Sequence, residues 1–213
     1  MRQATAIAPL LMALSCVSSS QAQTTGELWP EIDVYWSTTP RIRLFALARL
    51  LYRNPASHSS TQYGLHVDDM SLLSHGFVRL GYRFINTVND PAHPEQRGIL
   101  EATVHGIGAT RFVNRTRADL RFMDSGFSTR VRDRTRVEHD IVLSGTVVLR
   151  PFATAEAFYD SRFGGLARMR YQLGTEAYPL RRFGLDVQYV RQDTYRAARA
   201  YVDALSLELV ARF

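Results

Sequence analysis

The chain ends in Leu205-Ser-Leu-Glu-Leu-Val-Ala-Arg-Phe213, and this stretch decides the fold. Successive side chains of an extended strand point to opposite faces. On one face of such a strand every side chain is apolar: Leu205, Leu207, Leu209, Ala211 and Phe213. The other face carries the polar side chains, with a single apolar exception: Ser206, Glu208, Val210 and Arg212. The alternation predicts a β-strand with an apolar environment on one side and a polar environment on the other.

This ending resembles the closing strand of bacterial outer-membrane β-barrels, in which a terminal Phe helps the assembly machinery to recognise the chain. The resemblance implies an assembly signal, read by the barrel-assembly machinery during biogenesis and formed by Leu205, Leu207, Leu209 and Phe213. An ordinary C-terminal strand of a soluble periplasmic β-protein is the alternative that the pattern alone leaves open.

The N-terminal residues predict export. A basic start, Met1-Arg2, precedes the compact apolar run 7–14, and Ser20-Gln21-Ala22 supplies the small residues that a signal peptidase reads. We therefore expect a signal peptide over residues 1–22, cleaved near Ala22. Cys16 is the single cysteine, so the mature chain would have none for disulfides or thiolate chemistry. A lipidated Cys16 is a weaker alternative.

The charge of the chain comes from arginine alone. All 26 basic residues are Arg, and the formal net charge is +6. Guanidinium groups pair well with carboxylates and phosphates, so we expect acids inside the protein and outer-membrane lipid, including lipopolysaccharide, as partners. An exported chain would not meet nucleic acid, which excludes that partner. No stretch reaches 18 consecutive apolar residues, so a membrane could be crossed only by a closed barrel.

The rest of the chain reads as two-faced segments separated by turn residues such as Asn54-Pro55 and Gly164-Gly165. The predicted segments are 27–36, 41–52, 62–69, 77–86, 98–107, 114–123, 128–142, 145–159, 166–177, 183–192 and 201–213. Alternating segments of about ten residues are typical of transmembrane barrels. We therefore predict an all-β protein in which residues 23–213 form one transmembrane, antiparallel, up-and-down β-barrel of 10–12 strands in the cell outer membrane. Bacterial single-chain barrels have even strand numbers, so eleven segments suggest one miscounted strand.

The links between segments divide into two sets. Those at 87–97, 124–127, 160–165 and 193–200 should share one side, and those at 108–113, 143–144 and 178–182 the other. The first set is the longer one, which predicts that it faces outward and that Phe213 ends on the periplasmic side.

The polar faces of several segments carry rows of charge. An Arg at the bilayer midplane costs about 2–4 kcal/mol, so these residues should face the lumen. Acids with the same facing, among them Asp186 and Glu208, could pair with them and hold the strand register. The predicted lumen charge network consists of Arg115, Arg117, Asp119, Arg121, Arg130, Arg132, Arg134, Arg136, Glu138, Glu156, Arg168, Arg170 and Glu176.

Three functions follow from such a network. In the first, the barrel is a structural or envelope-associated protein without catalysis, and the charges form an inert polar core. In the second, the arginines line a narrow anion-selective pore. In the third, the rim carries a lipid-modifying enzyme, which would need a Ser–His pair. The six histidines, among them His58, His75 and His139, show no catalytic motif and no metal-ligand spacing, so we expect no catalytic residues, no metal and no cofactor.

Several blocks together resemble one family. They are Arg115-Thr-Arg-Ala-Asp-Leu-Arg121, Arg132-Asp-Arg-Thr-Arg136, Arg150-Pro-Phe-Ala-Thr-Ala-Glu-Ala-Phe-Tyr-Asp160 and Arg168-Met-Arg-Tyr-Gln-Leu-Gly174, preceded by a Trp-containing opening strand with Trp36. In this order they are similar to the uncharacterised Gram-negative outer-membrane barrel family called domain of unknown function 2490. The resemblance covers most of the mature chain and implies a barrel of this kind. It implies no activity and transfers no functional residue.

Overall fold

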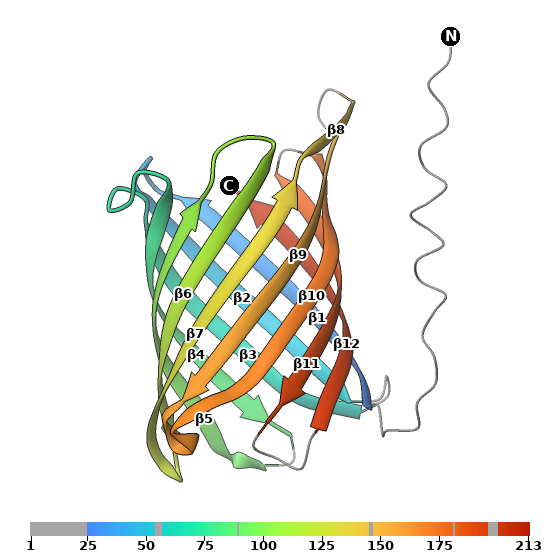
Figure 1. The fold of residues 1–213 in the computed structure, drawn as a ribbon. Helices are drawn as coiled ribbons and strands as arrows, with labels where there is room; N and C mark the ends of the chain where they lie inside the picture. The colour runs from blue at the N-terminus through green and yellow to red at the C-terminus, as the bar shows by residue number, and fades with distance from the viewer. Residues whose placement is uncertain (1–24, 54–56, 89, 145–146, 181, 196–199) are drawn as a thin grey trace.

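The computed structural model describes residues 25–213 except for 54–56, 89, 145–146, 181 and 196–199, so the expected signal peptide lies outside the described residues. The chain forms one closed β-barrel (Figure 1). Its strands are β1 (Thr25–Ser37), β2 (Ile42–Arg53), β3 (Ser57–Asp69), β4 (Gly76–Thr87), β5 (Asp90–His105), β6 (Thr110–Met123), β7 (Gly126–His139), β8 (Ile141–Ser144), β9 (Val147–Asp160), β10 (Gly165–Leu180), β11 (Phe183–Thr194) and β12 (Ala200–Arg212). The predicted all-β barrel is confirmed. None of the described residues forms a helix long and apolar enough to cross a membrane.

The barrel closes through a parallel pair. Neighbouring strands around the wall are antiparallel, but β1 and β12 run in the same direction, with Leu28 beside Leu205 and Ile32 beside Leu209. The closed wall has eleven strands, and the short β8 pairs with β9 outside it. Each predicted segment corresponds to one wall strand, so the suspicion of a miscounted strand is wrong. An odd number of strands is allowed because the closing pair is parallel rather than antiparallel.

The outside of the wall is apolar because alternate side chains point outward. Leu65, Leu80 and Leu173, which lie midway along their strands, are 71%, 67% and 65% exposed. Exposed aromatic side chains lie near the strand ends: Trp36, Phe112, Phe183 and Phe213 toward one mouth, and Phe122, Phe127 and Tyr159 toward the other. An apolar band between two aromatic girdles is the exterior of an outer-membrane barrel.

Among the described residues, polar side chains interrupt the outer face midway along β6 and β7. The Asp133 carboxylate accepts hydrogen bonds from the Thr116 hydroxyl at 2.7 Å and from the Asn114 amide at 3.2 Å. These two hydrogen bonds satisfy the Asp133 carboxylate, so it is not an unpaired charge on the apolar outer face.

The two mouths of the barrel have different connections. The mouth at which Phe213 lies, here called the upper mouth, carries the links 38–41, 70–75, 106–109 and the β8 extension (Figure 1). The lower mouth carries the links between β4 and β5, between β6 and β7 and between β9 and β10, and the grouping of links into two sets agrees with the sequence. Their lengths do not, because β5 already starts at Asp90 and residues 90–97 are strand rather than loop. The expectation that the longer links lie opposite Phe213 is therefore wrong.

His66 is packed into the inner side of the wall rather than at a loop or rim. Its ring stacks on Phe45 with centroids 5.0 Å apart and fills the space left by two glycines, Gly64 and Gly81. A Cβ at Gly81 would lie 2.1 Å from Nδ1 of the His66 ring. Only glycine fits there while the ring keeps this place.

Candidate functional site in the charged interior

All members of the predicted lumen charge network lie on inward-facing strand positions. The buried members are Arg117, Asp119, Arg121, Arg130, Arg132, Arg136, Glu138 and Glu156. The half-buried members line the interior cavities: Arg115, Arg134, Arg168, Arg170 and Glu176. Alternation along each strand accounts for this facing, since a charged row cannot share the apolar outer side.

Glu156 on β9 is the centre of an ion-pair group that spans four strands. Its carboxylate lies 2.8 Å from Arg132, 3.0 Å from Arg115 and 3.6 Å from Arg170. The three guanidinium groups come from β7, β6 and β10, so one acid joins four strands. The side chain of Glu156 is 1% exposed.

Other buried acids repeat this arrangement toward each mouth. Asp160 at the lower end of β9 lies 2.7 Å from Arg130 and 3.0 Å from both Arg121 and Arg162. Toward the upper mouth, the guanidinium of Arg136 bridges Glu138 at 2.7 Å and Glu176 at 2.5 Å. Each of these acids faces several arginines, so the interior pairs charges in groups rather than one to one.

Aromatic side chains add a second kind of support. The Arg136 guanidinium lies 3.8 Å from the centroid of the Phe152 ring, and Arg132 lies 4.7 Å from that of Phe158. Stacking on a ring face favours a guanidinium over an ammonium, which is consistent with a chain whose basic residues are all Arg.

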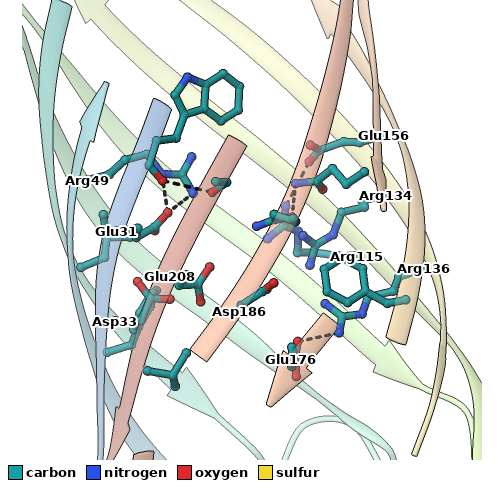
Figure 2. A pocket seen from close by; sticks show the side chains of 18 of the residues that line it. Glu31, Asp33, Arg49, Arg115, Arg134, Arg136, Glu156, Glu176, Asp186 and Glu208 are labelled. Carbon is teal, nitrogen blue, oxygen red and sulfur yellow. Dashed lines mark hydrogen bonds and ion pairs between the residues drawn. The ribbon is translucent and has the colours of Figure 1, made fainter. Parts of the chain in front are cut away.

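Arg134 differs from its neighbours. Its side chain faces the central cavity, and no carboxylate of the described residues lies within ion-pair distance of it (Figure 2). Its register partner across the β6–β7 pair is Arg115, another cation. The position of Arg134 therefore leaves a positive charge available to an ion in the cavity.

The opposite side of the cavity is acidic. Glu31 and Asp33 on β1, Asp186 on β11 and Glu208 on β12 form what we call the acidic corner (Figure 2). The parallel closing pair sets Glu31 level with Glu208, and the β11–β12 pair sets Asp186 level with Glu208. Arg49 contacts Glu31, but no guanidinium of the described residues lies within ion-pair distance of the other three acids.

The sequence did not reveal the acidic corner as a group. Asp186 and Glu208 were expected only as scattered partners of arginines, and Glu31 and Asp33 were not singled out. The carboxylates come from strands at the two ends of the chain, so no spacing within one segment connects them. The sequence indicated only that each of these side chains faces inward. It did not give the register between β1 and β12, which brings the carboxylates together.

Three cavities lined by described residues follow one another along the interior. A lower cavity of about 420 Å³ shares Trp29, Arg49, Arg83, Arg132 and Arg170 with the central cavity of about 210 Å³. An upper cavity of about 470 Å³ shares with the central one a second set: Tyr35, Arg79, Arg115, Arg134, Arg136, Glu176 and Arg212. Arginine layers thus separate adjoining cavities between the two mouths.

A smaller ion-pair group lies at the upper mouth. Asp140, in the link between β7 and β8, lies 2.6 Å from Arg150 and 2.8 Å from Arg111. The hydrogen bond from Arg150, together with that from Arg111, lowers the pKa of Asp140 to about 2.

These ion pairs make a pH-dependent contribution to stability. Because the pKa of Asp140 is lowered on folding, the stabilisation is complete above its ordinary value of about 4 and disappears as the pH falls toward 2. We expect Asp140→Asn to lose at most about 1 kcal/mol at neutral pH, as for exposed ion pairs. Urea unfolding of both proteins between pH 7 and pH 2 measures this difference. A difference that stayed constant down to pH 2 would contradict the assignment.

The histidine at the end of β7 forms a hydroxyl–imidazole pair on the outer surface. Nδ1 of His139 lies 2.7 Å from Oγ1 of Thr110, at the first position of β6, and both side chains are exposed. His139 therefore faces away from the lumen. His58 instead contacts the Thr61 hydroxyl at 3.0 Å and the backbone oxygen of Ser60 at 3.1 Å, near the lower mouth.

The predicted assembly signal lies on the outer face of β12. Leu205, Leu209 and Phe213 are 46%, 54% and 56% exposed, and Leu207 has the same parity. The Phe213 ring packs edge-on against Phe183, with centroids 6.3 Å apart. Recognition by assembly machinery stays a prediction.

The fold and interior define a closed β-barrel of outer-membrane type with a charged interior. The family model described as "Protein of unknown function (DUF2490)" matches residues 23–203, and the chain belongs to this family. No curated protein matches the chain. Among solved structures, LpxR from Salmonella typhimurium is similar, with a TM-score of 0.56 and 8% identity over 85% of this chain and 87% of that one. At this identity the likeness concerns the fold.

The comparison corrects one expectation. The sequence predicted a protein without enzymatic activity, but LpxR, whose barrel this fold resembles, is a lipid A deacylase. A barrel of this architecture can therefore carry catalysis, and the expectation of a non-enzyme is withdrawn.

Proposed function

We propose that the protein is an outer-membrane β-barrel whose interior binds small anions and passes them as a narrow anion-selective pore. The observation that carries the proposal is Arg134, an inward-facing guanidinium without a described carboxylate partner in the central cavity. Arginine-lined constrictions favour anions because they replace part of the ion's hydration with fixed positive charge. The apolar band and aromatic girdles support a place in the membrane.

The series of cavities supports passage in addition to binding. Adjoining cavities share lining arginines, so an anion leaving one layer meets the next without entering an apolar region. Ion pairs such as Arg132–Glu156 narrow the route, which restricts it to small solutes.

Conductance in planar bilayers tests the pore. We expect small unitary currents and a reversal potential in a salt gradient that indicates anion preference. Silence across chloride, phosphate and acetate salts, or a preference for cations, would overturn the proposal. Fractionation with the outer membrane and heat-modifiable gel migration test the location separately.

A second function is favoured by the exposed Thr110–His139 pair together with the likeness to LpxR, a lipid A deacylase. In this lipid-modifying reading, the imidazole of His139 takes the proton of the Thr110 hydroxyl, whose oxygen attacks the carbonyl carbon of an acyl ester in a membrane lipid. The ester C–O bond breaks, and the lipid alcohol leaves with the proton returned by the imidazolium. Water then hydrolyses the acyl-Thr110 ester and releases the fatty acid. The pair lies at the upper rim, beside the aromatic Phe112, where lipid head groups would meet the wall.

For this reading, overexpression should change the acylation of lipid A or phospholipid. Thr110→Ala and His139→Ala should each lower the rate of that change by about 10²–10⁴-fold, because each removes one partner of the proton transfer. Thr116→Ala, on the same outer face but bonded to Asp133, is the matched control and should keep the activity. Mass spectrometry of extracted lipid gives the readout, and an unaltered profile with the native protein rules the reading out.

A further inference from the structure

We propose that the acidic corner, formed by Glu31, Asp33, Asp186 and Glu208, binds one hard divalent cation of about the size of calcium. One carboxylate oxygen from each of Glu31, Asp33 and Glu208 lies within 4.8 Å of the other two. Carboxylate oxygens are the ligands that such cations prefer. This site does not rest on the proposed pore, because it is defined by a different wall of the cavity.

The charges of the corner are not balanced by the protein. Four carboxylates meet where the described residues provide one guanidinium contact, from Arg49 to Glu31. Glu208 stands level with Glu31 on one side and with Asp186 on the other, and like charges directly opposite in a sheet destabilise it. Elsewhere in the same interior each buried acid has two or more arginines, as Glu156 does.

Asp186 gives an independent indication of a ligand. It stands outside the group of three, on β11, and its side chain is 5% exposed. Its Oδ1 has no hydrogen-bond partner among the described residues, and its side chain lines the central cavity next to Glu208 (Figure 2). Oδ1 of Asp33 is also buried and has no hydrogen-bond partner among the described residues. Buried carboxylate oxygens are rarely left unsatisfied, so both oxygens are available to a cation.

The number of carboxylates favours calcium over magnesium. Ca²⁺ takes about six to eight oxygen ligands in a flexible arrangement, and three carboxylate oxygens within 4.8 Å of one another can reach one such ion. Mg²⁺ keeps several of its waters and is usually bound through only one or two carboxylates. The corner lines the central cavity, which provides room for water as the remaining ligands.

Terbium luminescence tests the site in the purified, folded barrel in detergent. Tb³⁺ replaces Ca²⁺ and emits when a nearby aromatic ring is excited, and the Tyr35 hydroxyl lies 3.4 Å from Oδ2 of Asp33. We expect saturable emission with one ion per chain, displaced by Ca²⁺, less readily by Mg²⁺ and not by Na⁺. Asp33→Asn and Glu208→Gln should each weaken binding at least tenfold.

Glu176→Gln is the matched control, because Glu176 lines the same cavity but is paired with Arg136 and Arg150. It should keep the affinity within about twofold. Heat-modifiable migration on a gel shows whether each variant is folded. If Asp33→Asn or Glu208→Gln does not fold, Asp186→Asn is measured in its place. The site is overturned if the native protein gives no saturable emission, or if the Asp33→Asn and Glu208→Gln variants bind Tb³⁺ as tightly as the native protein does. Stabilisation by Asp33→Asn in the presence of a chelator, without any ion binding, also overturns it and assigns a shared proton to the corner.

Discussion

Replacing Glu156 with Gln is expected to lower the free energy of unfolding by about 3–5 kcal/mol, the usual cost of removing one partner of a buried ion pair. The Glu156 carboxylate is 1% exposed and is shared by Arg115, Arg132 and Arg170. Its neutralisation leaves three guanidinium groups close together in a medium that screens them less than water does. Urea unfolding in lipid vesicles, followed by tryptophan fluorescence, measures the loss.

Asp193→Asn is the control for this substitution. Asp193 pairs with Arg191 at 3.6 Å, and their side chains are 33% and 45% exposed. Such a pair contributes at most about 1 kcal/mol. Equal losses for the two variants would show that the interior is hydrated like the surface, contrary to the arrangement described above.

Replacing Arg134 with Gln should reduce the anion-to-cation permeability ratio by about twofold or more. A unit charge acts on an ion about 8 Å away with about 0.5 kcal/mol even in bulk water, and more strongly inside a narrow cavity. The free energy of unfolding should stay unchanged or rise slightly, because Arg134 faces Arg115 across the β6–β7 pair. Removing Arg134 also leaves no carboxylate of the described residues without its ion-pair partner. Reversal potentials in bilayers and urea unfolding supply the two readouts.

Arg132→Gln is the matched variant on the same strand. Arg132 pairs with Glu156 at 2.8 Å and stacks on Phe158, so its removal should cost stability while changing selectivity less. If the two variants exchanged these effects, with Arg134→Gln destabilising and Arg132→Gln altering selectivity, Arg134 would not be the free charge of the pore.

The facing of side chains was predictable, because alternation needs only the local sequence. Arg130, Arg132 and Arg136 fall on one side of a strand whatever their neighbours are, and the structure places all three inward. The pairing of Glu156 with Arg115 and Arg170 was not predictable, because it depends on how β6, β9 and β10 are staggered. Stagger follows from closure of the whole wall rather than from any single segment.

The start of β5 shows another limit. Pro91 and Pro94 sit in a stretch that reads as a turn, yet the strand begins at Asp90. Proline lacks an N–H for the ladder but is tolerated at the beginning of a strand or beside an irregularity, and the β4–β5 register shifts between Ile85 and Thr87. Turn-forming residues therefore moved the expected boundary and, with it, the expected lengths of the links.

The parallel closing pair also constrains how such a barrel can arise. Duplication or loss of a hairpin changes the strand number by two and keeps both ends of the wall at the same mouth. A wall of eleven strands, which starts at Thr25 by the lower mouth and finishes beside Phe213 at the upper one, cannot be reached from an even barrel by hairpins alone. It requires the gain or loss of a single strand, a step that moves one end of the wall to the opposite mouth of the barrel.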